Sequence, residues 1–124
     1  MRVLLDTHLL LWALSSPAKL SKRARQRIDG GEVYASAASI WEISIKCALG
    51  KLAADPAEVL AGIAPAGFNH LPIVGAHAAK VMELPPIHKD PFDRLLVAQA
   101  RFEPMILLTD DEALGRYGDF VEVV

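Results

Sequence analysis

The sequence predicts an α/β fold, a three-layer α/β/α sandwich with a mainly parallel sheet of about five strands. Short apolar runs alternate with segments whose apolar residues recur at helical spacing, the pattern of a parallel sheet covered by helices. Hydrophobic residues make up 52% of the 124 residues, enough for a core without disulfides or a structural metal. We therefore expect residues 1–124 to form a single domain.

The first half of the chain is predicted to hold two buried strands, over residues 2–5 and 33–35. Asp55-Pro56 is typical of a helix start, because Asp caps the first turn and Pro fits the first helical position. Glycines follow two of the expected helix ends. Helices are predicted over about residues 9–15, 21–30, 36–49 (opened by Ser36 or Ser39) and 56–64.

The second half continues the alternation. Residues 70–73 predict only a weak edge strand, because Pro72 has no N–H to donate. The remaining elements are a helix over 75–83, a helix from Pro91, a buried strand over 105–108, a short helix and a last strand over 120–124. Ligands of such sheets lie outside the carboxyl ends of the strands. Asp6, Asp110 and Asp111 follow two strands, so we expect them at that edge.

The helix from Pro91 carries acids on its first turn. Asp90 is a good N-cap, and Asp93 falls at the third helical position, where the helix dipole favours negative charge. Two interpretations follow. Both acids serve only to cap a core helix, or Asp90 caps it and leaves Asp93 free to bind a ligand.

Four acids stand in otherwise apolar segments: Asp6, Glu42, Asp93 and Asp111, with Asp90 and Asp110 as near neighbours. Carboxylates beside core segments are costly unless something compensates them, and clustered carboxylates repel one another. A hard divalent cation, Mg²⁺ or Mn²⁺, would resolve both problems, because it prefers oxygen ligands and pairs with phosphates. The chemistry that this predicts is metal-dependent hydrolysis of phosphodiesters.

Four blocks of sequence, in this order, resemble the PIN-domain ribonucleases, and more narrowly the VapC toxins of toxin–antitoxin pairs. The blocks are Val-Leu-Leu-Asp-Thr-His at residues 3–8, Ser-Ile-Trp-Glu-Ile-Ser-Ile-Lys at 39–46, Asp-Pro-Phe-Asp-Arg-Leu-Leu-Val-Ala-Gln-Ala at 90–100, and Leu-Leu-Thr-Asp-Asp at 107–111. The likeness covers essentially the whole chain. It implies a PIN-like fold.

The resemblance also implies a set of site residues. Asp6, Glu42 and Asp93 match the family's metal-binding acids, and Asp111 matches the acid of its Thr-x-Asp motif. Because x is itself an aspartate, Asp110, the pattern leaves open which of the two faces the metal. Thr7 and Thr109 match hydroxyl positions that orient ligands or water. The family further implies endoribonuclease activity, a homodimer and an antitoxin (VapB-like) that blocks the site.

Three other classes of protein are alternatives to this one. A receiver-like signalling module would need paired acids after the first strand and a late lysine, and a haloacid-dehalogenase-like phosphatase would need Asp-x-Asp where this chain has Asp6-Thr7-His8. A catalytically inactive PIN-like protein-binding domain is the third alternative.

Lys46, four residues after Glu42, predicts either an ion pair with it or a phosphate contact. Arg94 predicts a salt bridge, and the histidines predict no zinc site.

Composition narrows the setting. Formal net charge is −2, so no global basic footprint indicates nucleic-acid binding, although five basic residues lie between positions 19 and 27. Cys47 is the only cysteine, which excludes a disulfide framework within the chain. No apolar run approaches the ~20 residues of a membrane span, and the N-terminus lacks the order of a signal peptide. A cytoplasmic location is the expectation.

Overall fold

A five-stranded sheet forms the middle of the computed structural model, which describes residues 1–124. All neighbouring strands pair in parallel, in the order β3-β2-β1-β4-β5. This confirms the predicted fold class. The strands are β1 (Arg2–Leu5), β2 (Glu32–Ser36), β3 (Asn69–Leu71), β4 (Ile106–Thr109) and β5 (Val121–Val123).

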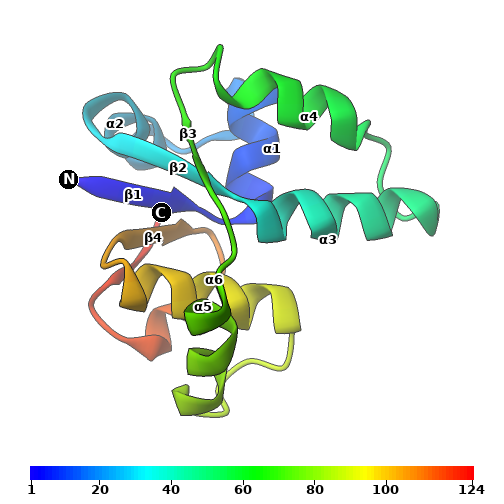
Figure 1. Cartoon of the computed structure of the whole chain (residues 1–124). Helices are drawn as coiled ribbons and strands as arrows, with labels where there is room; N and C mark the ends of the chain where they lie inside the picture. The colour runs from blue at the N-terminus through cyan, green and yellow to red at the C-terminus, as the bar shows by residue number, and fades with distance from the viewer.

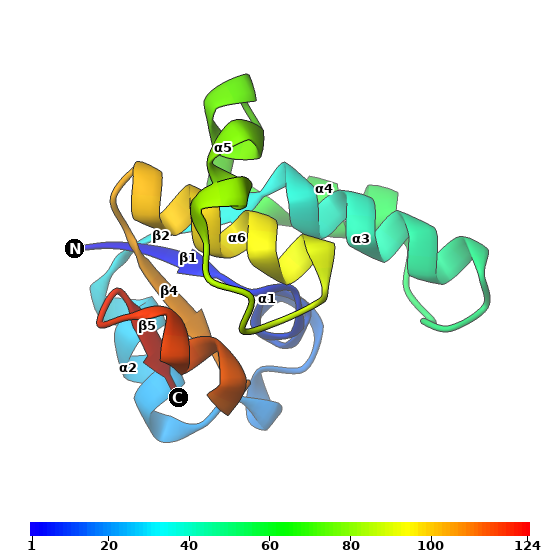
Figure 2. The same ribbon diagram turned by 90° about the horizontal axis from the view of Figure 1, so that it is seen from below.

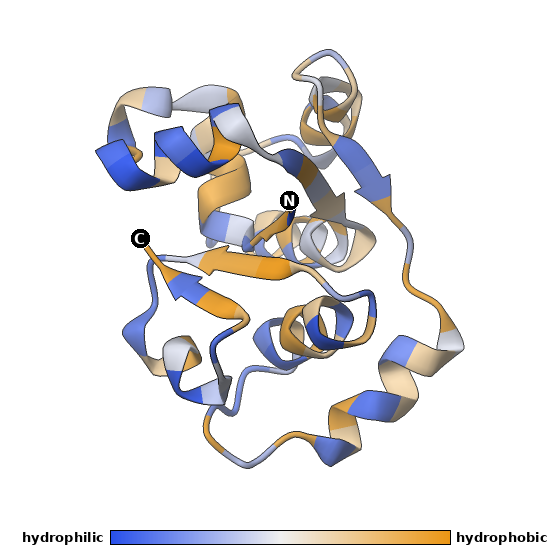
Figure 3. Ribbon diagram, turned by 90° about the vertical axis from the view of Figure 1, so that its left-hand side faces the viewer, coloured by the Kyte–Doolittle hydropathy of each residue, from blue (hydrophilic) through white to orange (hydrophobic).

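The central strand β1 is apolar on both faces. Val3, Leu4 and Leu5 have no exposed surface. Because successive side chains of a strand point to opposite faces, Leu4 packs in one hydrophobic cluster, and Val3 and Leu5 pack in the other. Figure 3 shows hydrophobic strand segments at the centre of the molecule, with helices of mixed hydropathy around them.

Helices cover both faces of the sheet. Figures 1 and 2 show α1, α2 and α4 on one side and α5 and α6 on the other, and the two hydrophobic clusters divide the same way. The α-helices are α1 (Thr7–Ser15), α2 (Lys22–Gly30), α3 (Ala37–Ala48), α4 (Pro56–Ile63), α5 (Gly75–Lys80) and α6 (Pro91–Phe102). Three 3-10 helices complete the fold: η1 (Pro17–Lys19), η2 (Val81–Glu83) and η3 (Glu112–Tyr117).

Several boundaries differ from the sequence expectation. Helix α1 begins at Thr7 rather than near residue 9, because the Asp6 side chain accepts the Leu9 N–H and acts as its N-cap. Ser36, not Ser39, caps α3. Strand β3 ends at Leu71, before Pro72, and the short helix after β4 is a 3-10 helix.

Helix α3 extends past the ends of β1 and β2, as Figure 1 shows. It contacts α1, α4 and α6, so it bridges the two helix layers. At its start, the Ser36 hydroxyl lies 2.6 Å from Oε1 of Gln99 on α6, and both residues are fully buried. This contact fixes α3 against α6 at the edge where the strands end. None of the helices is long and apolar enough to span a membrane.

Candidate metal centre

A polar cavity of about 170 Å³ lies at the carboxyl end of the sheet. It is formed where β1 and β4 end and where α1, α3 and α6 come together. Six of its eleven lining residues are acids, and they come from four separate segments of the chain. The lining is Asp6, Thr7, His8, Leu11, Glu42, Lys46, Leu52, Asp90, Asp93, Asp110 and Asp111. Every acid that the sequence analysis singled out therefore lies at one site.

Asp6 is the most enclosed aspartate of the cavity, with 5% of its surface exposed. One carboxylate oxygen accepts the Leu9 N–H at 2.8 Å, and the other accepts the Thr109 hydroxyl at 2.5 Å. Burial raises its pKa to about 6, and the charge of Asp110 adds to the rise, while the two hydrogen bonds oppose it. Asp6 thus carries its negative charge at a considerable free-energy cost in the metal-free protein.

Glu42 reaches the cavity from α3 and is 4% exposed. The Thr7 hydroxyl donates to its Oε1 at 2.7 Å, and Lys46 Nζ donates to its Oε2 at 2.6 Å. Glu42 raises the pKa of Lys46 chiefly through this hydrogen bond, and Asp90 and Asp93 add to the effect. The predicted ion pair of Lys46 is confirmed. Its ammonium group also lines the cavity, where it is the only lysine or arginine.

The first turn of α6 supplies two acids with different duties. Oδ1 of Asp90 accepts the N–H groups of Phe92 and Asp93, at 2.8 and 3.1 Å, so Asp90 caps the helix as predicted. The Asp93 carboxylate takes no part in capping. Burial raises its pKa to about 7, with further contributions from the charges of Asp90 and Glu42. Of the two interpretations of this turn, the geometry matches the one that leaves Asp93 free.

The end of β4 brings Asp110 and Asp111 to the same edge. Asp111 caps η3 through Oδ1, which accepts the Ala113 N–H at 2.9 Å. Its own N–H donates to the Thr109 hydroxyl oxygen at 3.0 Å. Asp110 lies on the other side of the strand end, with Oδ1 3.9 Å from Nδ1 of His8. Both aspartates line the cavity, Asp110 on the side of Asp6 and Asp111 on the side of α6.

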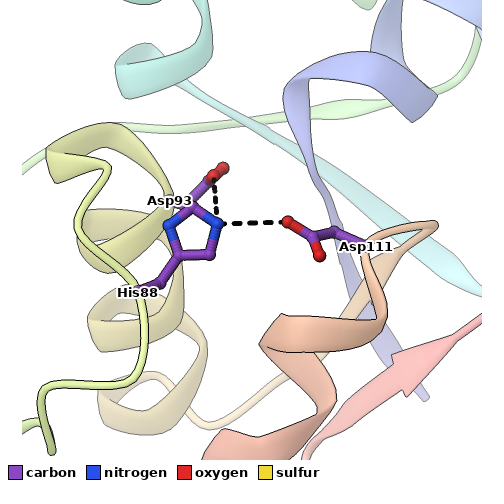
Figure 4. A group of neighbouring side chains, drawn as sticks. All are labelled: His88, Asp93 and Asp111. Atoms are coloured by element: carbon purple, nitrogen blue, oxygen red, sulfur yellow. Dashed lines mark hydrogen bonds and ion pairs between the residues drawn. The ribbon is translucent and has the colours of Figure 1, made fainter.

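Two histidines join the site that the sequence analysis did not assign to it. Nε2 of His88 lies 3.2 Å from Oδ2 of Asp111 and 3.7 Å from Oδ2 of Asp93 (Figure 4). These three residues offer potential metal-ligand atoms that all lie within 4.8 Å of one another. The ring of His8 stacks on Trp12 at the cavity rim, with ring centroids 5.6 Å apart. Only the position of His88, two residues before the capping Asp90, could have indicated its role.

The salt bridge predicted for Arg94 is wrong. Its guanidinium group instead donates to backbone carbonyls of the segment before α6, including Val81 at 3.1 Å and Pro85 at 3.1 Å. It also donates to the Tyr117 hydroxyl at 3.2 Å. That hydroxyl accepts the His88 N–H at 3.0 Å. Arg94 therefore holds the segment that carries His88 and Asp90. Both of its terminal NH2 groups donate to these acceptors, and no acid lies within salt-bridge distance.

The donor set fits a hard divalent cation. Carboxylate oxygens dominate the cavity, and Mg²⁺ and Mn²⁺ prefer oxygen ligands. Burial, with the charges of neighbouring acids, raises the pKa of Asp6 and of Asp93, so the ionised forms of both are disfavoured in the metal-free site. A bound cation would supply positive charge and lower both pKa values. The residues that could hold it are Asp6, Glu42 and Asp93, with Asp111 beside them.

Comparison with known proteins gives a consistent result. The family described as the PIN domain matches residues 3–119. One similar structure is the crystal structure of VapBC2 from Rickettsia felis bound to a DNA fragment from their promoter. A chain of it matches with a TM-score of 0.71 and 12% sequence identity, and the match covers 100% of this chain and 98% of that one. The crystal structure of FitAcB from Neisseria gonorrhoeae matches with a TM-score of 0.65 and 22% sequence identity, covering 98% of this chain and 95% of that one. At these identities the two structures show a shared fold. No curated protein matches the sequence.

Proposed function

Because this chain belongs to the PIN domain family, we propose that it is a metal-dependent endoribonuclease and the toxin of a toxin–antitoxin pair. Mg²⁺ or Mn²⁺ would be held by Asp6, Glu42 and Asp93, directly or through water, with Asp111 bordering the site. The observation that carries the proposal is the cavity itself. Asp6, which is buried, and Asp93, which is partly buried, have pKa values raised to about 6 and about 7, and they share the cavity with Glu42 at the carboxyl edge of a parallel sheet.

The chain's own residues prepare this site in distinct ways. Leu9 N–H and the Thr109 hydroxyl fix the two oxygens of Asp6, and Thr7 and Lys46 fix those of Glu42. The carboxylates are therefore held in place before any ligand binds, which lowers the cost of organising the site. When bound, the cation would activate water and stabilise the charge that develops on the phosphate. Lys46 would contact a phosphate at the cavity mouth, since its side chain is 45% exposed.

We also propose an antitoxin as partner, and a homodimer. The two similar structures are of the complexes VapBC2 and FitAcB, and the present chain has an apolar surface that a partner could cover. Trp41 of α3, Leu49 just after α3 and Leu60 of α4 are 57%, 62% and 48% exposed. Large exposed apolar side chains that gather on neighbouring helices are typical of protein interfaces. A cytoplasmic location would agree with cellular RNA as substrate.

Incubation of the purified chain with total cellular RNA tests the nuclease. We expect discrete cuts with Mg²⁺ or Mn²⁺, none with EDTA, and none with Asp93→Asn under any condition. Asp29→Asn is the matched control. Asp29 is an exposed aspartate near the end of α2, and α2 covers the face of the sheet opposite to the one that α6 covers. Cutting by Asp93→Asn at the wild-type rate would refute the proposed catalytic centre.

Expression of the chain in a bacterial host tests the toxin role separately. We expect growth arrest with the wild type, no arrest with Asp93→Asn, and recovery when the short open reading frame beside the gene is expressed as well. If the purified chain cuts RNA but its expression leaves growth unaffected, the nuclease assignment stands and the toxin assignment fails. An inactive PIN-like protein-binding domain would give neither cutting nor arrest.

A further inference from the structure

His88 is oriented by a contact that settles which of its ring nitrogens carries hydrogen. The backbone N–H of Asp90 points at Nδ1 of His88, with a nitrogen–nitrogen distance of 3.1 Å. A backbone N–H can only donate, so Nδ1 must present its lone pair. The neutral ring then carries its hydrogen on Nε2. Nε2 lies 3.2 Å from Oδ2 of Asp111 and 3.7 Å from Oδ2 of Asp93, so its hydrogen is directed at the Asp111 carboxylate. Dashed lines in Figure 4 mark both contacts.

This tautomer is the wrong one for a metal ligand. A histidine that binds a metal offers the lone pair of one ring nitrogen and donates the hydrogen of the other to an acceptor. Here Nδ1 already accepts a hydrogen bond, so Nε2 has no lone pair to offer. Turning the ring would leave the Asp90 N–H without its partner, which is unfavourable. Although His88, Asp93 and Asp111 are close enough to surround an ion, His88 is built as a donor.

The Nε2–H group of His88 lies next to the two carboxylates, Asp93 and Asp111, that a second cation would need as ligands. In two-metal nucleases the ions lie about 3.5–4 Å apart and share carboxylate ligands. Asp93 is the acid that could be shared here, since the charges of Glu42 and Asp6 act on its carboxylate. Its Oδ2 also lies 3.7 Å from the ring nitrogen of His88 that contacts Asp111. The space between Asp93 and Asp111 contains the Nε2–H group. Both oxygens of Asp111 are also engaged, Oδ1 by the Ala113 N–H and Oδ2 by His88.

We propose that His88 is a positioning residue whose Nε2–H donates to Asp111 and lies beside Asp93 in place of a second metal ion, so that the site holds a single cation beside Asp6, Glu42 and Asp93. This inference rests on the proposed function. It deepens that function by assigning the metal stoichiometry and by giving Asp111 a role as the partner of His88 rather than as a metal ligand. Tyr117 and Arg94 hold the His88 backbone from outside the cavity, by 3.0 and 3.4 Å hydrogen bonds.

Titration with Mn²⁺, followed by calorimetry and by pulsed electron paramagnetic resonance, tests the proposal without any assay of activity. For the wild type we expect about one ion per chain and no coupling to an imidazole nitrogen. His88→Ala removes the donor and opens the space between the two carboxylates, so we expect a second ion to bind. His88→Gln keeps an N–H donor and should retain about one ion. His70→Ala, an exposed histidine on β3, is the matched control and should behave as the wild type.

Each result decides the question. Two ions in the wild type would overturn the proposal, and so would a nitrogen coupling that disappears in His88→Ala, which would identify His88 as a ligand. A single ion in a folded His88→Ala variant, with folding checked by thermal melting, would show that the donor does not replace a cation. Failure of the wild type to bind any Mn²⁺ would instead refute the metal site of the proposed function, and the two failures are thereby distinguished.

Discussion

Replacing Asp6 with asparagine should stabilise the metal-free protein at pH 8. In the wild type the pKa of Asp6 rises from 3.8 to about 6 on folding, so at pH 8 the ionised form is penalised by about 3 kcal/mol. Asparagine carries no charge and is as good an N-cap as aspartate, so the Leu9 N–H keeps its acceptor. The Thr109 hydroxyl loses a charged acceptor, at a cost of about 1 kcal/mol. The net gain is about 2 kcal/mol, or about 8 °C in Tm.

The pH dependence gives the prediction its sign. Between pH 4 and pH 6 the folded wild type binds more protons than the unfolded chain, so its stability falls as pH rises. The penalty is complete above pH 6 and is less than about 1 kcal/mol at pH 4. The advantage of Asp6→Asn should therefore be large at pH 8 and vanish at pH 4. Asp93, whose pKa is also raised, adds to the same trend between pH 4 and about 7.

Thermal unfolding in EDTA at both pH values measures this difference. Asp55→Asn is the matched control, because Asp55 is an exposed N-cap that accepts the Ala57 N–H at 2.9 Å, and it should change Tm little at either pH. Saturating Mn²⁺ should reverse the order at pH 8, since the wild type gains more from binding than a variant that lacks a ligand. A loss of stability in Asp6→Asn at pH 8 in EDTA, or an equal gain at pH 4, would refute the reasoning.

Three further predictions concern the groups around the cavity. Arg94→Met should lower the free energy of unfolding, measured by urea denaturation, by about 3 kcal/mol, because several backbone carbonyls lose their donor. The control Arg101→Met removes an exposed arginine of the same helix and should have little effect in the same assay. Lys46→Met should lower the free energy of unfolding by about 1–2 kcal/mol at pH 7, because it leaves Glu42 without its counter-charge. Most of this loss should disappear when Glu42→Gln is also present. Additive effects of the two substitutions in this double-mutant cycle would contradict the coupling. Ser36→Ala should lower the free energy of unfolding by about 2 kcal/mol, because it removes the cap of α3 and the contact with Gln99. Ser44→Ala, on the exposed side of the same helix, should stay near the wild type in the same assay.

The sequence alone was sufficient to predict the fold class and to predict which acids lie together. Apolar strands that alternate with amphipathic helices leave few arrangements other than a parallel sheet between helix layers, and strand ends of such a sheet share one edge. That reasoning placed Asp6, Asp110 and Asp111 together, and they do line one cavity with Glu42 and Asp93. Local signals also held where a side chain acts on its own turn, as Asp90 does in capping α6.

Tertiary structure decided the partners of each polar group, because these come from segments that are distant along the chain. Arg94 could satisfy its donors with an acid or with backbone carbonyls, and only the path of residues 81–88 around α6 selected the carbonyls. The role of His88 depends on the contact of its ring with Asp90 N–H and on the approach of Asp111 from β4. Hydropathy and spacing describe what a residue could do within its own element. The choice among those possibilities is made by the neighbours that folding brings within hydrogen-bond distance.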